Sequence, residues 1–289
     1  VYGYVTIRNC WIHHNLGQGI LGSATDGLTI ENCLIECNGN VNETTHGRLD
    51  HGIYAGGKRI IIRNNVVRFN TGSGLQLYNS APGGVDGCAI YNNLVYGNGF
   101  NQKLLSSATA GMYIQVGYNH TAESAATLER CVVNNNTVFG NGGNGIVLAG
   151  LNTPVQHIVA NNLVFQNFVM GDDKTGQIVR WPGSPVSVLA VSNYVDAAPS
   201  AYWSDPVGGL GGLTWDASNI VSEENLFVDP ALGWLSPRSG CIGTADPAYR
   251  PPVSFFGGTR GIGTDPFDIG AIDTSDRLLY PDDWWARES

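Results

Sequence analysis

One short sequence pattern recurs along most of the chain and constrains its fold more than any other feature. The pattern is an alternating apolar run, a polar pair, x-Val, an asparagine and then a glycine before a second apolar run. Its clearest copy spans Ile61 to Ser80. The polar pair begins at Asn9, Asn32, Asn64, Asn92, Asn135 and Asn161, and six residues later comes Asn15, Asn38, Asn70, Asn98, Asn141 and Asn167. The glycines are Gly19, Gly52, Gly74, Gly111, Gly145 and Gly176.

Each copy contains three short runs in which apolar residues alternate, which is the periodicity of strands. Successive copies begin 23, 32, 28, 43 and 26 residues apart, as the polar pairs at 9, 32, 64, 92, 135 and 161 show. Three strands per repeat, joined by turns, predict one coil of a parallel β-helix, with coils stacked about 4.8 Å apart. The inward residues expected in the third copy are Ile60, Ile62, Val67, Phe69, Leu75 and Leu77.

The recurring asparagines have a structural explanation. Asparagine tolerates the left-handed conformation of a tight turn, and its amide can bond the equivalent amide one coil above. We therefore expect the polar pairs to form ladders. The replacement Asn92→Ala should then cost about 1 kcal/mol of stability through one lost ladder bond.

On these repeats, the chain resembles the right-handed parallel β-helix proteins of the pectate-lyase-like superfamily, over about Val5 to Asn193. The repeated pattern is specific for the fold and not for an activity. The stretches Asn225 to Ala231 and Asp268 to Asp273 are similar to the closing segment of bacterial secreted members. The resemblance implies a secreted or periplasmic all-β protein.

The domain prediction is a single solenoid over residues 1–289, with about seven or more coils. Regular coils occupy 1–193, and degenerate coils with an irregular C-terminal cap occupy 194–289. Degenerate coils are expected at Asn219 and Asn225, and the tail with Trp284 and Trp285 is expected to cover the last coil. An exposed sheet edge needs such a cover.

The net charge of the chain limits the classes of partner that we expect it to bind. Fifteen basic against 24 acidic residues give a net charge of −9, which argues against broad binding to nucleic acid or anionic membranes. No run of about 18 apolar residues is present to span a membrane. We expect a monomer. Because the chain starts at Val1 and Val5 is already in mid-repeat, we also expect a processed or truncated product with earlier coils.

Four of the six cysteines occupy matching repeat positions in neighbouring coils. The pairs are Cys10 with Cys33 and Cys88 with Cys131. Stacked neighbours are within disulfide reach, but parallel side chains favour packed free thiols, which is our prediction. No CxxC spacing occurs, so the sequence does not indicate a zinc or redox site.

Long insertions flank the glycine-apolar strands of coils two to four. They cover 39–51, 99–110 and 117–130. Long loops on a repeat scaffold gather on the functional face, so we expect a groove there. Alternation predicts that Tyr54, Gln76, Tyr113 and Val147 point outward, with Tyr78 and Gln115 at the strand ends, so that coils two to four present aromatic and amide groups and coil five is apolar.

A dense polar cluster lies beside this face, between His46 and Arg59. Arg63 and Arg68, by contrast, are expected to point to solvent from the other two sheets. The predicted catalytic residues are Arg48, Asp50, His51 and Tyr54. The predicted substrate-binding residues are His46, Lys58, Gln76, Tyr78, Tyr113 and Gln115.

The resemblance implies an extended polysaccharide as substrate or partner. Tyrosines can stack on sugars, and glutamines can hydrogen-bond hydroxyls or a carboxylate. The favoured reaction is β-elimination of a uronate polymer, with His51 or Tyr54 as base and acid and Arg48 with Gln76 on the carboxylate. Asp50 would orient His51, similar to the Asp-His pair of pectate lyases.

Two alternatives stay open. A glycoside hydrolase would pair Asp50 with Glu43 or Glu123, with Asp86 a weaker choice. A non-catalytic surface protein would only bind polysaccharide, and Asp50 and His51 would then order their loop.

No cofactor is predicted with certainty, and calcium is kept as an alternative. Glu43, Asp50, Asp172 and Asp173 supply the oxygen ligands that calcium takes, but their spacing does not form a coordination loop.

Overall fold

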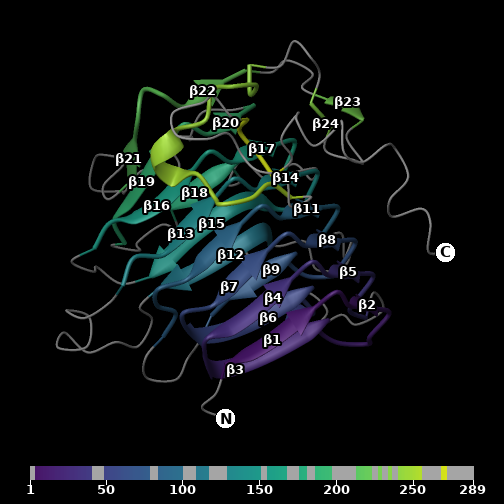
Figure 1. Ribbon diagram of the computed structural model, residues 1–289. Helices are drawn as coiled ribbons and strands as arrows, with labels where there is room; N and C mark the ends of the chain where they lie inside the picture. Colours follow the sequence, from purple (N-terminus) through teal and green to yellow (C-terminus); the bar gives the residue numbers. More distant parts are fainter. Residues whose placement is uncertain are drawn as a thin grey trace.

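The chain folds as an elongated stack of coils made of three parallel sheets (Figure 1). The computed structural model describes residues 4–40, 49–78, 84–99, 109–116, 129–150, 155–167, 176–180, 186–196, 213–222, 227–229, 234–235, 240–255 and 268–271. Coils one to six each contribute one strand to each sheet, and within the described residues the last two coils contribute only to the first and second sheets. Sequence neighbours therefore lie in different sheets, and stacked neighbours come from successive repeats.

The first and second sheets have eight strands each, and the third has six. The first sheet contains β1 (Val5–Arg8), β4 (Leu28–Glu31), β7 (Ile61–Arg63), β10 (Ala89–Tyr91), β13 (Val132–Asn134), β16 (His157–Ala160), β19 (Val188–Val191) and β21 (Leu213–Trp215). The second sheet contains β2 (Trp11–His13), β5 (Leu34–Glu36), β8 (Val66–Arg68), β11 (Leu94–Tyr96), β14 (Thr137–Phe139), β17 (Leu163–Phe165), β20 (Tyr194–Val195) and β22 (Ile220–Val221). The third sheet contains β3 (Ile20–Asp26), β6 (Ile53–Lys58), β9 (Leu75–Leu77), β12 (Ala110–Val116), β15 (Asn144–Gly150) and β18 (Ile178–Arg180).

The stacking register confirms the alignment of the repeats. Val5 pairs with Leu28, and Ile30 pairs with Ile62. Equivalent residues therefore lie directly over one another, although successive copies differ in length. The different lengths of the segments between strands therefore do not shift the register of the strands.

Six asparagines turn the chain between the first and second sheets, and we call them the corner asparagines. All have φ between 53 and 57°, a left-handed conformation that asparagine tolerates better than most residues. They are Asn9, Asn32, Asn64, Asn92, Asn135 and Asn161.

In coils three to six the second residue of each polar pair, an asparagine, builds the first ladder, which corrects the prediction for Asn92; in coils one and two this position is Cys10 or Cys33. Asn93 Nδ2 donates to Asn136 Oδ1 at 2.9 Å, and Asn136 Nδ2 donates to Asn162 Oδ1 at 3.0 Å. Asn92 Nδ2 donates to the carbonyl of Val253 at 2.6 Å and makes only a longer ladder contact, at 3.5 Å, with Asn64 Oδ1. The left-handed turn explains the difference, because it directs the first side chain outward and the second into the stack.

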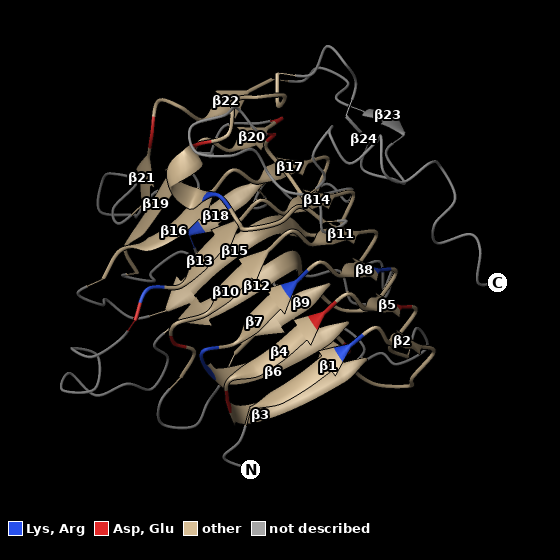
Figure 2. Cartoon of the chain, in the orientation of Figure 1, with Lys and Arg blue, Asp and Glu red and all other residues tan. Residues whose placement is uncertain are grey.

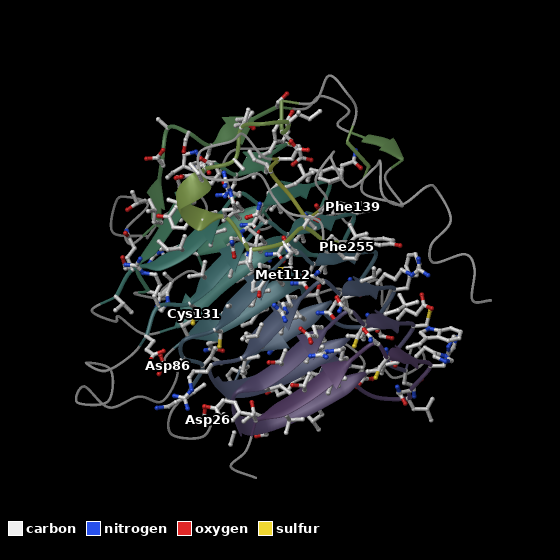
Figure 3. The ribbon with its side chains drawn as sticks, viewed as in Figure 1. Asp26, Asp86, Met112, Cys131, Phe139 and Phe255 are labelled. Carbon is white, nitrogen blue, oxygen red and sulfur yellow. The ribbon has the colours of Figure 1, made fainter. Side chains whose placement is uncertain are left out.

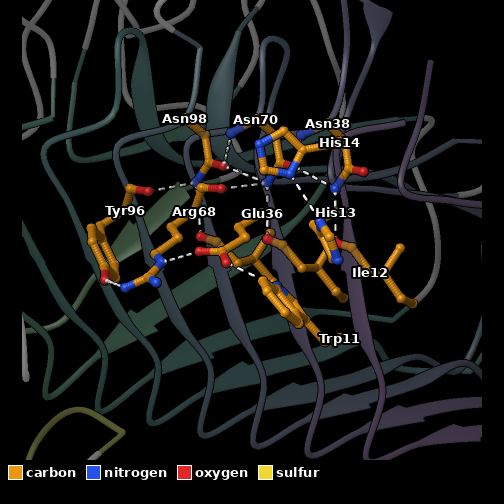
Figure 4. Close-up of polar contacts among 12 residues, drawn as sticks. Trp11, Ile12, His13, His14, Glu36, Asn38, Arg68, Asn70, Tyr96 and Asn98 are labelled. Carbon is orange, nitrogen blue, oxygen red and sulfur yellow. Dashed lines mark hydrogen bonds and ion pairs between the residues drawn. The ribbon is translucent and has the colours of Figure 1, made fainter. Parts of the chain in front are cut away.

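The second ladder runs through the asparagines that follow six residues later, as Figure 4 shows for Asn38, Asn70 and Asn98. It ends at Gln177, whose Oε1 accepts from Asn167 Nδ2 at 2.8 Å. Because Ile146 pairs with Ile178, Gln177 takes the repeat position that we assigned to Gly176. The predicted glycine of coil six was therefore one residue out of register.

The core confirms most of the predicted inward positions. In the third copy Ile62, Val67, Leu75 and Leu77 are fully buried. Phe69 is the exception, since 51% of it is exposed and its φ is 56°. It occupies a left-handed corner between the second and third sheets, so strand alternation does not apply to it.

The recurring glycines allow close approach between coils. A methyl group on Gly111 would overlap Cγ1 of Val138 and would lie 2.8 Å from Nδ2 of Asn141. We expect Gly111→Ala to lower the free energy of unfolding by about 2 to 3 kcal/mol, because a close-packed interior accommodates extra atoms poorly. Urea denaturation would measure this. Gly17→Ala is the matched control, since the nearest atom would be 4.0 Å away, and an equal loss in both variants would contradict the prediction.

The described C-terminal residues 240–255 and 268–271 form a strap along the outside of the stack. Phe255, Ile269 and Ala271 belong to one cluster with Leu94 and Phe139 of the second sheet, and Figure 3 shows Phe255 beside Phe139. Within the described residues, the strap lies over the corner between the first and second sheets and not across the end of the last coil. The predicted cap residues Trp284 and Trp285 lie outside the described chain.

The predicted degenerate coils are half confirmed. Ile220 and Val221 form β22 of the second sheet. The stretch after Asn225, however, forms β23 (Phe227–Asp229), which pairs antiparallel with β24 (Trp234–Leu235) and does not add a coil. The one described helical turn is the 3-10 segment Pro247–Tyr249. None of the described helical segments has the length and apolar character needed to cross a membrane.

Candidate functional site

Three polar or aromatic side chains form a row on the outer face of the third sheet. Tyr54 pairs with Gln76, and Gln76 pairs with Tyr113, so the three lie on adjacent strands in register. All three are half-buried. The row continues to Val147, which is fully buried in a cluster with Tyr113. The polar face predicted for coils two to four is present, and it ends at a covered apolar surface in coil five.

Tyr78 brings the tyrosines together. It follows β9 directly, and its ring lies 6.3 Å from that of Tyr54 at an interplanar angle of 63°. Burial and the neighbouring Tyr78 raise the pKa of Tyr54, and the same two causes raise the pKa of Tyr113 to about 12. These phenols are protonated donors at neutral pH. Gln115, half-buried on the same face, completes the group.

His51 lies beside this row, and its environment restricts its chemistry. It is 2% exposed, and its ring is nearly parallel to that of Tyr54, with centroids 5.7 Å apart. The backbone N–H of Ser73 donates to Nδ1 at 2.9 Å, so the neutral ring carries its proton on Nε2. Burial lowers the pKa of His51 to about 4. In this arrangement His51 is a neutral hydrogen-bond donor, and its basic nitrogen is already occupied.

The position of His51 is part of a repeated structural device. At three positions that directly precede a glycine strand of the third sheet, a side chain accepts the backbone N–H of the next coil. Ser73 Oγ accepts from Ala110 N at 3.1 Å, and Asn144 Oδ1 accepts from Gly176 N at 2.9 Å. His157 makes a similar contact in the first sheet, but in the opposite direction along the stack, since Nδ1 accepts from Cys131 N of the preceding coil at 3.1 Å. His51 therefore connects two coils whether or not it serves a ligand.

The imidazole of His51 is not oriented by Asp50, as we had expected, but by Ser73. Oδ2 of Asp50 accepts the backbone N–H of Asn40 at 3.1 Å, while Ser73 fixes the ring of His51. Asp50 orders its own turn, as the non-catalytic interpretation predicted for it.

The structure separates some predicted site residues from the tyrosines. Lys58 lies at the far end of β6, 4.0 Å from the carboxylate of buried Asp86. Arg59 pairs with Asp26. His46 and Arg48 lie outside the described residues, as do Glu43 and Glu123 of the alternative carboxylate pair.

Arg63 and Arg68 belong to two matching ion-pair rows on the other sheets and are not simply solvated. Arg63 Nε donates to Glu31 at 2.6 Å, and Arg68 Nε donates to Glu36 at 2.6 Å. Arg8 adds a second ion pair to Glu31. Figure 2 shows the resulting alternation of charge along β1, β4 and β7, and Figure 4 shows Arg68 and Glu36. Both glutamates are nearly buried and already paired.

All six cysteines are free thiols, as predicted for the stacked pairs. Cys88 and Cys131 are buried one above the other, and the amide of Cys88 donates to the sulfur of Cys131 at 3.4 Å. Burial and packing explain these residues without a covalent bridge.

No group of three or more His, Cys, Asp or Glu side chains within the described ranges is placed to hold a metal ion. Of the four acidic residues considered for calcium, Asp50 is described and engaged by Asn40. Glu43, Asp172 and Asp173 lie outside the described part of the chain.

The three parallel sheets, the continuous asparagine ladders and the aromatic outer face define a β-solenoid protein with a candidate ligand face on its third sheet. A family model described as "right handed beta helix region" matches residues 3–179. This is more than half of the chain, which therefore belongs to the right-handed β-helix family. Searches of curated proteins and of solved structures gave no match.

Sequence reasoning missed the structural partner of His51. Ser73 immediately precedes Gly74, as His51 immediately precedes Gly52. Because His51 and Ser73 share this repeat position in successive coils, a contact between them could have been predicted. The burial of Val147 left no comparable signal, because alternation gives the direction of a side chain and not what covers it.

His51 should make stability depend on pH. Its folded pKa of about 4 is depressed from about 6.5. The stabilisation is therefore complete above about pH 6.5 and is lost as the pH falls toward 4, by about 3 kcal/mol. His51→Asn keeps an acceptor for Ser73, as Asn144 does for Gly176, but cannot gain a proton. The difference in unfolding free energy between the two proteins, measured in urea from pH 7.5 to 4, should shift in favour of the variant. A constant difference would contradict the assignment.

Proposed function

We propose that this β-helix protein binds an extended polysaccharide across the outer face of the third sheet and cleaves a uronate-containing polymer there by β-elimination. One observation carries the proposal. Tyr54, Gln76 and Tyr113 lie in register on adjacent strands, with Tyr78 and Gln115 beside them. Parallel strands repeat these groups along the stack, as sugar units repeat along a polymer.

Each side chain has a distinct part in binding. The tyrosine rings offer apolar faces to sugar rings while their hydroxyl groups donate hydrogen bonds. The carboxamides of Gln76 and Gln115 both donate and accept, so they suit hydroxyls and a uronate carboxylate. His51 supports the ring of Tyr54 from one side. The cation for the carboxylate would be Arg48, next to the described turn at Leu49 and Asp50.

In the elimination, a base removes the C5 proton of the uronate. The C–H electron pair forms the C4=C5 double bond, the C4–O bond breaks, and the leaving oxygen gains a proton. Tyr54 as phenolate can accept the first proton and return it to the leaving oxygen, so the step balances without another reactant. Because burial raises the pKa of Tyr54, turnover should increase toward alkaline pH.

A substrate screen tests this function. The full chain would be incubated with alginate, pectate, ulvan, glycosaminoglycans and neutral polysaccharides, with and without chelator. Ultraviolet absorbance of unsaturated uronate and new reducing ends would both be followed. A joint rise on a uronate polymer supports the proposal and names the substrate. Reducing ends without absorbance would replace the lyase by a hydrolase. Retention on a polymer without cleavage would leave a binding protein. The absence of both cleavage and retention would overturn the proposal.

A further inference from the structure

The corner asparagines of coils three to six hold the C-terminal strap by its backbone. Asn64 Nδ2 donates to the carbonyl of Phe255 at 2.9 Å, and Asn92 Nδ2 donates to the carbonyl of Val253 at 2.6 Å. Asn161 donates to the carbonyl of Asp246 at 2.9 Å and accepts its N–H at 2.7 Å. Contacts of this kind recognise the polypeptide backbone and not a particular side chain.

An apolar row beside the asparagines completes this binding surface. The outer residues of the second sheet form a register that passes through Leu34, Val66 and Leu94. In coils three to seven this row is covered, and the strap contributes Phe255 and Ile269 to the same cluster. The strap is therefore held both by amide donors and by an apolar row.

Coils one and two present the same two components, and no described residue of the strap covers them. Asn9 and Asn32 have φ of 55 and 53°, are exposed, and make no side-chain hydrogen bond within the described chain. Beside them the apolar row continues through Leu34 to Trp11, which is 56% exposed.

Trp11 is held in a fixed orientation. Its indole Nε1 donates to Glu36 Oε1 at 2.9 Å, and its ring stacks on His13 at 3.9 Å between centroids (Figure 4). A fixed exposed aromatic ring loses little entropy when a ligand covers it.

We propose that coils one and two form a docking site for an apolar polypeptide segment of a partner protein, held through its backbone carbonyl groups. Carbonyl groups of the segment would accept from Asn9 and Asn32, and an apolar side chain would cover Trp11 and Leu34. The occupant is inferred from continuity, because the same surface already holds a polypeptide segment by its backbone in coils three to six. The site is distinct from the tyrosine face and does not depend on polysaccharide cleavage.

A synthetic peptide with the strap sequence of residues 246–255 is the probe. It would be labelled with fluorescein and titrated into the full chain while its anisotropy is followed. Only a few contacts are available, so we expect a Kd of about 10⁻⁴ M. Asn32→Asp keeps the side-chain shape but removes the donor, and Trp11→Ala removes the ring. Each should weaken binding by at least about fivefold.

Leu21→Ala is the matched control, since Leu21 is also exposed on coil one (68%) but belongs to the third sheet. It should bind the peptide as the wild type does. Thermal unfolding would confirm that each variant is folded, with Trp11→Phe as a replacement if Trp11→Ala is not. No binding at about 1 mM, or binding that Asn32→Asp and Trp11→Ala leave unchanged, would overturn the proposal. So would a labelled oligosaccharide that binds at Trp11 while the peptide does not, or self-association that Trp11→Ala abolishes while the peptide stays unbound.

Discussion

Replacement of Asn98 by alanine should lower the free energy of unfolding by about 3 to 4 kcal/mol, which is a large effect for a single substitution. Asn98 is fully buried. Its Oδ1 accepts from the backbone N–H of Asn70 at 3.1 Å and from Asn70 Nδ2 at 2.9 Å. Its own Nδ2 donates to Asn141 Oδ1 at 3.0 Å and to the carbonyl of Val67 at 3.0 Å. Alanine would leave these partners buried and unpaired, at a cost of about 1 to 3 kcal/mol each before relaxation.

Asn15→Ala is the matched control, because Asn15 ends the same ladder and is exposed. Its loss should cost less than about 1 kcal/mol, since water can satisfy the groups left behind. Chemical denaturation of both variants would measure the difference. Equal losses would show that the ladder contributes no more in the interior of the stack than at its end.

Tyr54→Phe should lower turnover of the uronate polymer by at least about a hundredfold with the fold intact, as expected when a group that transfers protons is removed. The phenyl ring remains, so stacking on sugar and affinity for the polymer should change little. Turnover would be followed by absorbance of unsaturated uronate, and affinity by retention on the uncleaved polymer. Tyr91→Phe is the control, because the Tyr91 hydroxyl accepts from Arg63 on the first sheet.

Two substitutions of His51 separate its chemical and structural parts. We expect His51→Ala to lower turnover by about a hundredfold, because it removes the ring that positions Tyr54, but it also leaves the Ser73 N–H without an acceptor. His51→Asn restores an acceptor and removes the imidazole. Loss of turnover in both variants assigns the ring to the reaction. Full turnover in His51→Asn and in Tyr54→Phe would move the active site elsewhere.

The fold was predictable because it repeats. Because the same pattern occurs six times, a misplaced residue in one copy can be recognised by comparison with the others. The strands and inward residues of coils one to six could therefore be predicted from the alignment of the repeats. The errors occurred where a residue leaves the strand geometry. Phe69 is in a left-handed corner, and Gln177 replaces the glycine in coil six. The distinction between Asn92 and Asn93 depends on backbone direction at one turn, which spacing does not specify.

The sequence predicted which side chains form the floor of the candidate site, but it did not predict their protonation states. Alternation correctly directed Tyr54, Gln76 and Tyr113 outward. The protonation states depend instead on burial and on neighbours from other coils, such as Ser73 for His51 and Tyr78 for Tyr54. These contacts join residues about one coil apart, so only the stacked structure brings them together.

The strap has a consequence for cooperativity. A solenoid behaves as a one-dimensional array, in which each coil is stabilised by its immediate neighbours and the ends can fray. The strap contacts coils from Asn64 to Asn161, and Gly240 lies against Tyr194 of coil seven. By tying distant coils to one segment, it makes their opening mutually dependent. Coils one and two lie beyond this tie, so their amides should exchange hydrogen through local opening while those of coils three to seven exchange as one unit.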